Sequence, residues 1–500
     1  MPPKVDALGI RFFTAKSGVL SCAANGTNIH SSYDPEHEAE RFVAAISAPF
    51  YPQYVVVVEP ALSYCAHFFR KRFPAAVLAA VRYEADFSET DKAWDIVFDA
   101  AQNEKGLSDA LFDRLGEEGL CSALFASWQP SARAFPEKDA AAWQEIKYAV
   151  DKGRDVLFTR SCFASRWIAN AFFICRHIER ARRIVKGSSS VVVAASGPSL
   201  KSALPYLAEF RPSYFLIAAS SALSVLTAYG IVPDVCIATD GGFYAKAHLS
   251  PLSRFPHIPL ALAQEASCSG DILSTCGIIP LSYGDGFAAS LFTACGSPSM
   301  NIERNGTVSG SALDFARSVT DGSVFLCGLD MAPASGLQHA QPNALEKGAA
   351  AFYMKTYSNE TKNSASRFAS GSLELYRKWF QSLPKAQVQN VYRLAHDYRF
   401  SNTLGAIADV DIAFFEQSLS PYKIPPRIED EALPKKEAVQ KSARDFLKLH
   451  AGSDAWLHEI FPAEYVLRQR ETDAGEREKK AKTLAKKSDA LSKKIARIVG

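Results

Sequence analysis

The chain has 500 residues, 48% of them apolar and 22% charged, which is the composition of a folded globular protein rather than a disordered or fibrous one. Its 56 Lys and Arg against 53 Asp and Glu leave a net charge of +3, too small to attract nucleic acid or an anionic membrane by overall charge. The ten cysteines form no CxxC pair and no zinc-like pattern, so they predict buried thiols in a reducing compartment. The first residues lack a signal-peptide pattern, and we expect a cytoplasmic protein.

Residues 1–170 are predicted to form an N-terminal α/β domain, a degenerate Rossmann-like half. An amphipathic segment, a strand, a helix and a second strand follow one another at residues 35–47, 54–58, 62–72 and 76–81. The turn after the first strand, Glu59–Ser63, contains no glycine that would let the backbone approach a phosphate. A structural role is therefore favoured for this turn, with a retained ligand site as the alternative.

An uncharged stretch between Arg211 and Asp234 is long enough to raise the question of a membrane span. Serines, a glycine and a proline interrupt it, however. Two buried strands at Tyr214–Ala219 and Val235–Ala238 explain it better, because strands buried on both faces are continuously apolar. We therefore expect no membrane span.

Residues 171–420 are predicted to form a central α/β domain with a doubly wound, Rossmann-like parallel sheet. Between residues 188 and 413, short apolar runs alternate with helical or loop segments, the pattern of a parallel sheet flanked by helices. The predicted strands lie at residues 191–194, 215–218, 235–237, 260–263, 278–281 and 324–327. A long helix over residues 161–185 is predicted to precede this sheet.

Residues 421–500 are predicted to form a C-terminal helical region. It begins with a linker, SPYKIPPRIED, at residues 420–430. In the last helix, Leu484, Leu491, Ile495 and Ile498 share one face. This pattern favours a helix that packs on the protein itself, with docking of a partner as the alternative.

The strongest local signal is the segment SSSVVVAASGPSLK at residues 188–201. A predicted strand leads into Ser196, Gly197, Pro198 and Ser199, and a helix follows at residues 200–210. Such a turn directs backbone N–H groups and the positive end of a helix to the carboxyl edge of the sheet, where an anion is stabilised. It lacks the GK[ST] of a Walker loop, and an ordinary capped turn is the alternative.

Two acidic residues follow predicted strands and therefore point toward the same edge of the sheet. Asp240 follows VCIAT, and Asp330 follows VFLCGL, with Gly328 beside it. His339 comes nine residues after Asp330, within loop reach of the same crevice, and is the leading candidate for a general acid or base. Surface capping for the acids and a surface position for the histidine are the alternatives.

A further segment, Asn305–Phe315, leads into a helix with small and hydroxyl-bearing residues. Thr307 and Ser309 in this segment suit hydrogen bonding to a ribose or a phosphate at the start of a helix. Helix capping alone is the alternative explanation.

Taken together, four segments resemble the bacterial motility-associated factor (Maf) family of flagellin glycosyltransferases. They are SSSVVVAASGPSLK (188–201), GIVPDVCIATDGG (230–242), NGTVSGSALDFARSVTDGSVFLCGLDMA (305–332) and SGLQHA (335–340). The segments YDPEHEA (33–39) and TRSCFASRWIANAF (159–172) also resemble the family, so the resemblance spans roughly residues 30–415. The turn Glu59–Ser63 departs from it, because family members often have a glycine-rich turn there.

This resemblance implies transfer of a nonulosonic, sialic-acid-like sugar of the pseudaminic or legionaminic type from its CMP conjugate to Ser or Thr of flagellin, before export. The central domain of the family is similar to bacterial sialyltransferases. That likeness places Ser196, Gly197, Pro198 and Ser199 along the CMP phosphate, Thr307, Ser309, Gly328 and Asp330 on the nucleotide, Asp240 facing the donor or acceptor, and His339 as a base. No cofactor is expected beyond the CMP-sugar donor, although Asp240 and Asp330 leave room for a divalent metal ion.

Two other functions remain open from the sequence. The same type of central domain resembles an archaeal 6-hydroxymethylpterin pyrophosphokinase, which would need ATP and a metal ion at Asp240 and Asp330. The chain could instead be a non-catalytic factor that binds flagellin through its C-terminal helices.

Overall fold

The computed structural model describes residues 9–100, 106–332, 339–345, 367–395, 400, 402–419 and 423–500. The chain forms two compact units. Unit 1 comprises Met1–Cys162 and Asp454–Asp489, and unit 2 comprises Phe163–Ser453 and Ala490–Gly500. The predicted boundary at residues 170 and 171 therefore lies within helix α5 (Pro136–His177), and the predicted C-terminal region is divided between the units.

Unit 1 contains a parallel four-stranded sheet with the strand order β6-β5-β4-β7. The strands are β4 (Tyr54–Val58), β5 (Val77–Arg82), β6 (Ile96–Asp99) and β7 (Ala123–Ser127). The helices in this part of the chain are α1 (Pro35–Ala45), α2 (Tyr64–Arg72), α3 (Leu107–Cys121) and α4 (Gln129–Ala134). Val55, Val56, Val57 and Val58 are fully buried, which explains why the central strand is apolar on both faces.

A smaller antiparallel sheet precedes these elements in unit 1. It has the strand order β1-β2-β3, from β1 (Arg11–Thr14), β2 (Leu20–Ala24) and β3 (Thr27–Asn28). Short sequence separations between its strands allow the simple hairpin connections that antiparallel pairing needs.

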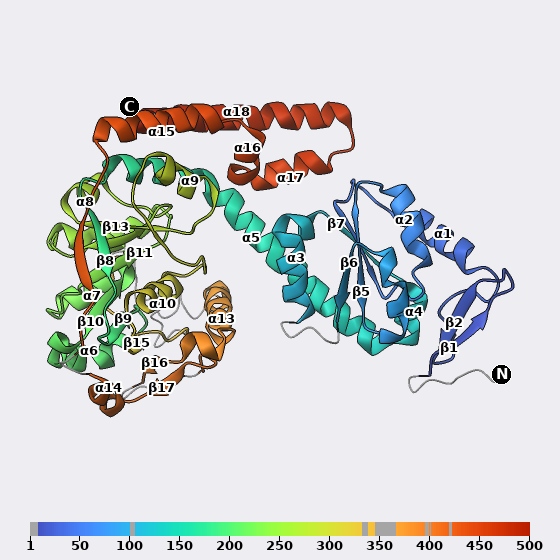
Figure 1. The fold of residues 1–500 in the computed structure, drawn as a ribbon, viewed down its shortest axis with the longest axis horizontal. Helices are drawn as coiled ribbons and strands as arrows, with labels where there is room; N and C mark the ends of the chain where they lie inside the picture. Colours follow the sequence, from blue (N-terminus) through green and yellow to red (C-terminus); the bar gives the residue numbers. More distant parts are fainter. Residues whose placement is uncertain are drawn as a thin grey trace, which may run out of the picture. The chain divides into compact units, whose positions relative to one another are not determined.

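Unit 2 contains an eleven-stranded sheet (Figure 1) with the order β17-β16-β15-β9-β10-β11-β12-β13-β8-β18, and β14 pairs with β13 off this path. The strands are β8 (Ala181–Val185), β9 (Val191–Ala194), β10 (Phe215–Ala219), β11 (Val235–Ala238), β12 (Leu260–Ala263), β13 (Ile278–Ser282), β14 (Met300–Asn301), β15 (Val324–Cys327), β16 (Val391–Leu394), β17 (Ala408–Val410) and β18 (Arg427–Glu431). The pairings are parallel except for β18 with β8. The predicted parallel α/β sheet is confirmed.

Helices cover both faces of this sheet. The packing of β9 shows this, since its alternate residues contact helices on opposite sides. Val192 and Ala194 join a buried cluster with α6 (Leu200–Glu209) and α7 (Leu223–Ala228). Val191 and Val193 join another with α10 (Val308–Val319). Further described helices of this unit are α8 (Gly270–Thr275), α9 (Gly286–Ala294), α13 (Arg367–Gln381), α14 (Ile412–Ser418) and α15 (Lys436–His450).

Two predicted elements of unit 2 were wrong. The helix predicted over residues 161–185 ends at His177, and its last residues form strand β8 instead. The predicted linker at residues 420–430 contains most of β18, which pairs with β8. The physical reason is cross-strand charge pairing, since Arg183 and Glu429 approach within 2.6 Å and Arg182 also contacts Asp430. Such charged strands carry no apolar run in the sequence.

The C-terminal part of the chain is helical, as predicted. It forms α16 (Asp454–Ile460), α17 (Pro462–Arg470) and α18 (Ala474–Val499). Leu484, Leu491 and Ile495 of the predicted apolar face are buried, and Ile498 is half-buried. Within the described ranges, no helix is long and apolar enough to cross a membrane.

Candidate functional site

The sheet of unit 2 has a topological switch point between β9 and β15. From β9 the chain continues through β10 to β13 on one side, whereas β15, β16 and β17 lie on the other. In open parallel sheets, a crevice forms at such a point, outside the carboxyl ends of the two strands. The turn of residues 196–199 follows β9 and residues 328–330 follow β15, so both predicted motifs lie at this crevice.

These two loops pack directly against each other. The Gly197 amide donates a hydrogen bond of 2.8 Å to the Gly328 carbonyl oxygen. A Cβ atom at Gly197 would lie 2.5 Å from Oδ2 of Asp330 and from the Gly328 carbonyl oxygen, which is too close for any side chain. Gly328 itself has a φ of +68°, a conformation that favours glycine. Both glycines are therefore required by close packing.

Asp330 is buried beneath the turn, with 3% of its surface exposed. Its Oδ2 accepts a hydrogen bond of 2.8 Å from the Ser199 amide, at the start of α6. Burial raises the pKa of Asp330 above its ordinary value, while Ser199 and Arg393 oppose this shift. The carboxyl group thus fixes the beginning of α6 rather than facing solvent.

Arg393 and Asp409 support Asp330 from neighbouring strands, and the sequence analysis did not identify them. The Arg393 side chain is fully buried, and its Nε lies 2.6 Å from Oδ1 of Asp409. Its Nη2 donates to the carbonyl oxygen of Asn402, whose Nδ2 donates to the Asp330 carbonyl oxygen. An arginine within a short apolar strand was the available signal in the sequence.

Two amides of the turn after β9, those of Gly197 and Ser199, are already used within the protein. They donate to residues 328 and 330, and Pro198 has no N–H group. At the start of α10, Oγ1 of Thr307 caps the helix by accepting from the Gly310 amide. No hydrogen bond between described residues uses the amides of Val308 and Ser309. These two amides are therefore open to bind an anion at the start of α10.

The segment of His339 reaches the same crevice. The amide of the next residue, Ala340, donates a hydrogen bond of 2.7 Å to the Ser196 carbonyl oxygen. The His339 ring lies 6.4 Å, centroid to centroid, from His248. The structure therefore brings His339 near the turn after β9, as the sequence predicted from loop reach alone.

Asp240 lies at the end of β11 and is exposed. Its Oδ1 accepts a hydrogen bond of 2.7 Å from the Gly242 amide. Among the described residues, no hydrogen bond or ion pair joins Asp240 to Asp330, and no three His, Cys, Asp or Glu side chains lie together as a metal-binding group. A divalent metal ion at these acids stays a prediction.

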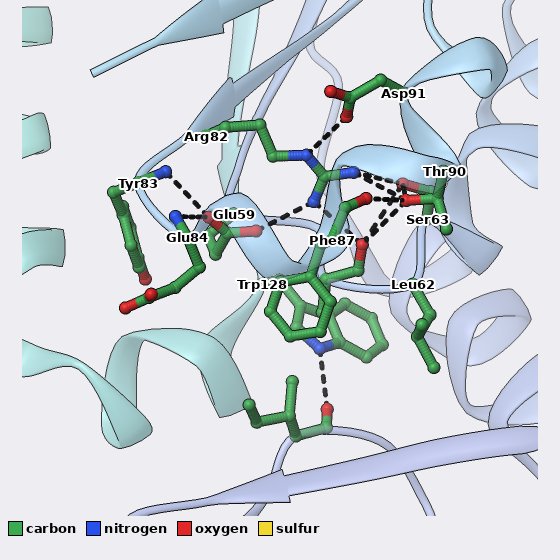
Figure 2. Close-up of polar contacts among 12 residues, drawn as sticks. Glu59, Leu62, Ser63, Arg82, Tyr83, Glu84, Phe87, Thr90, Asp91 and Trp128 are labelled. Carbon is green, nitrogen blue, oxygen red and sulfur yellow. Dashed lines mark hydrogen bonds and ion pairs between the residues drawn. The ribbon is translucent and has the colours of Figure 1, made fainter. Parts of the chain in front are cut away.

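In unit 1, the turn after β4 is held by a buried ion pair, shown in Figure 2. Arg82 Nη1 lies 2.8 Å from Oε1 of Glu59, and both side chains are almost fully buried. The other carboxylate oxygen of Glu59 accepts hydrogen bonds from the amides of Tyr83 and Glu84. Burial raises the pKa of Glu59, and Arg82 with these amides opposes the shift.

All five N–H groups of the Arg82 guanidinium have acceptors (Figure 2). The acceptors, besides Glu59, are the Ala61 carbonyl oxygen, Ser63 Oγ, Thr90 Oγ1 and Asp91 Oδ1. Three residues of this turn, Glu59, Ala61 and Ser63, have positive φ angles of 40°, 47° and 62° although none is glycine. The guanidinium fills the turn, which supports the structural role favoured from its sequence.

A buried histidine contacts the same turn. Nε2 of His30 accepts a hydrogen bond of 3.1 Å from the Leu62 amide, which requires this nitrogen to be unprotonated. Burial lowers the pKa of His30, and Glu38 opposes this shift. The folded protein therefore holds His30 in its neutral form.

The lowered pKa of His30 makes the stability of unit 1 depend on pH. In the unfolded chain the ring takes a proton below about pH 6.5, so the free energy of unfolding should fall as the pH drops from about 6.5 toward the lower folded-state pKa. Urea unfolding between pH 7.5 and 5 measures this loss. His30→Gln should flatten the dependence, and His67→Gln, on the exposed side of α2, should not. Equal slopes in all three proteins would contradict the assignment.

Comparisons with known proteins agree with this architecture. A family model described as "6-hydroxymethylpterin diphosphokinase MptE-like" matches residues 165–336. An uncharacterized protein of Treponema pallidum (strain Nichols) is 30% identical over 293 residues, which are 59% of this chain and 64% of that protein. The chain thus matches less than two thirds of the length of this curated relative.

The solved structure of "MAf glycosyltransferase from Magnetospirillum magneticum AMB-1" is similar with a TM-score of 0.57 at 11% sequence identity. The similarity covers 98% of this chain and 92% of that one. At this identity the likeness is one of fold. It confirms the predicted resemblance to the Maf family, at the level of the fold, over nearly the whole chain.

Proposed function

We propose that this protein is a glycosyltransferase that moves a nonulosonic acid from its CMP conjugate to Ser or Thr hydroxyls of flagellin. The observation that carries the proposal is that the turn of residues 196–199, Asp330 and the segment of His339 meet beyond the carboxyl ends of β9 and β15. The shared fold with the MAf glycosyltransferase supports it. The transfer takes place in the cytoplasm before export and serves flagellar assembly and motility.

In the proposed reaction, the bond between the anomeric carbon of the sugar and the phosphate oxygen of CMP breaks. A new bond joins that carbon to the acceptor hydroxyl oxygen, and His339 takes the hydroxyl proton. The CMP phosphate leaves with the bonding electron pair. The positive N-terminal end of α10, whose first amides are open, stabilises its charge.

The residues of the candidate site have different roles in this proposal. The amides of Val308 and Ser309 contact the phosphate, because they are the ones left open at the start of α10. Gly197 and Asp330 hold the turn after β9 in place, because their contacts are made within the protein. Asp240 is exposed and is the alternative base.

A second candidate function is favoured by one observation, the match of residues 165–336 to the diphosphokinase-like family model. Such an enzyme would transfer a diphosphate from ATP to a pterin and would use a metal ion at Asp240 and Asp330. The separate unit 1, with its own buried sheet and no counterpart within the matched range, favours a protein acceptor over a small pterin.

The test is transfer by the purified protein to unmodified flagellin, read out by intact mass. With CMP-pseudaminic or CMP-legionaminic acid as donor, we expect mass increases that equal whole numbers of sugar residues. Parallel reactions contain EDTA, or ATP with hydroxymethylpterin in place of the sugar donor. Calorimetry with CMP and with ATP measures which nucleotide the site binds.

The outcomes separate the candidates. AMP release from ATP and pterin would establish the diphosphokinase instead. Flagellin binding without transfer from either donor, and without CMP binding, would leave a non-catalytic binding factor. Transfer that stops in EDTA and returns with Mg²⁺ would establish a metal requirement.

A further inference from the structure

Four aromatic side chains lie beside the carboxyl end of β11. We call them the aromatic strip, and they are Phe163, Trp167, Phe243 and Tyr244. Phe243 and Tyr244 are 57% and 74% exposed, and their ring centroids are 5.4 Å apart. Phe163 and Trp167 on α5 are stacked at 6.0 Å and are half-buried. Large exposed aromatic side chains gathered in one place on a folded protein are typical of an interaction surface.

The backbone beneath the exposed rings is held at several points. A Cβ at Gly241 would lie 2.3 Å from the Trp167 ring, so the loop backbone lies directly on that ring. Nδ2 of Asn170 donates a hydrogen bond to the Gly241 carbonyl oxygen. Further along, Leu249 and Leu252 are fully buried. The two rings are therefore exposed on a fixed loop, which lowers the entropic cost of binding through them.

The position of this loop connects the strip to the proposed site. It begins at Asp240, the alternative base, and it continues to His248, whose ring lies 6.4 Å from that of His339. Phe243 and Tyr244 are in the middle of this segment. A hydroxyl group delivered to Asp240 therefore arrives beside the strip.

Charge and shape indicate what kind of molecule fits the strip. Arg166 lies 5.4 Å from the Phe163 ring centroid and Lys246 lies 4.0 Å from that of Phe243, so cations flank both pairs of rings. A small ligand such as a nucleotide needs a concave site that encloses most of its surface, whereas Phe243 and Tyr244 are mostly exposed. An extended polypeptide with apolar and acidic side chains matches such a surface.

We propose that the aromatic strip docks the acceptor polypeptide, through a segment with apolar and acidic side chains next to the hydroxyl that is modified. The inference rests on the proposed function and adds an acceptor subsite to it. The strip determines which Ser or Thr is presented. The candidate bases, His339 and Asp240, serve to take the proton of that hydroxyl group.

The test compares the double variant Phe243→Ser and Tyr244→Ser with the wild type and with Tyr229→Ser. Tyr229 is 55% exposed and precedes β11, whereas the strip lies beyond the carboxyl end of that strand, so it is a matched control. We expect the double variant to raise the KM for flagellin at least about tenfold. Its kcat at saturating flagellin and its affinity for CMP should stay within about twofold of the wild type.

A second measurement separates this inference from the proposed function. Binding of unmodified flagellin to the immobilised protein, without donor, should be lost in the double variant and kept in Tyr229→Ser. Lys246→Glu should weaken the same binding and reduce its dependence on salt. Flagellin binding that depends on the strip, with no transfer from any of the donors, would overturn the proposed function but not the acceptor surface.

Two results would overturn the inference itself. The first is an unchanged KM for flagellin in a double variant that unfolds at the wild-type temperature. The second is weaker CMP binding with unchanged flagellin binding, because the rings would then serve the nucleotide.

Discussion

Replacing His339 by alanine is expected to lower the turnover of flagellin modification by roughly 10²–10⁴-fold, the usual contribution of a positioned base. The affinity for the CMP-sugar donor should change little, because a base acts on the acceptor hydroxyl and not on the nucleotide. The position of its segment against the Ser196 carbonyl oxygen motivates this expectation. Steady-state kinetics with varied donor, combined with calorimetry for CMP, measure the two quantities separately.

The neighbouring His248 provides the matched control for this experiment. Its ring is 6.4 Å from His339, so His248→Ala removes an imidazole from the same region without removing the proposed base. We expect a much smaller loss of turnover from it. Flagellin that remains fully modified in a strain carrying only His339→Ala would exclude this residue, and Asp240→Asn would then be the variant to test.

The largest expected effect on stability comes from Arg82. Replacing it by methionine leaves the Glu59 carboxylate buried without its partner and removes the donors to the strained turn. Removing one member of a buried ion pair costs about 3–5 kcal/mol, so Arg82→Met should lower the free energy of unfolding of unit 1 by this amount. Urea unfolding followed by tryptophan fluorescence measures it, since Trp94 and Trp128 are buried beside the turn.

Arg70→Met is the control. Arg70 makes an ion pair with Asp95 through two hydrogen bonds, and each of the two side chains is about 40% exposed. We expect a loss below about 1 kcal/mol from it. The double variant Arg82→Met with Glu59→Gln should recover part of the stability, because the unpaired charge is then absent. A loss in Arg82→Met no larger than in Arg70→Met would contradict the structural role of the ion pair.

Most strands of unit 2 could be predicted from the sequence because their residues are buried on both faces. The strands β9, β10, β11, β12, β13 and β15 appear in the chain as short apolar runs between turn residues, and each was predicted within one residue at either end. The strands β8 and β18 could not be predicted this way. Their stability comes from charge pairs between residues nearly 250 positions apart, and no local pattern records such partners.

In the candidate site, too, positions along the chain could be predicted from the sequence, whereas contacts between distant residues could not. That Asp330 follows a strand and lies at the carboxyl edge could be predicted from the run VFLCGLD. That its carboxylate accepts from the Ser199 amide could not, because the two residues are 131 positions apart and meet only when β9 pairs with β15. The amides predicted to hold an anion are for this reason occupied at Gly197 and Ser199.

The composition of the two units has a consequence for how the protein is made. Unit 1 includes residues 454–489, and within it Arg470 donates a hydrogen bond to the Cys121 carbonyl oxygen. Unit 2 includes residues 490–500, where the Val499 carbonyl oxygen accepts from Gln440. Until residue 489 has been translated, neither unit has all of its residues. We therefore expect a premature stop near codon 453 to damage both units at once.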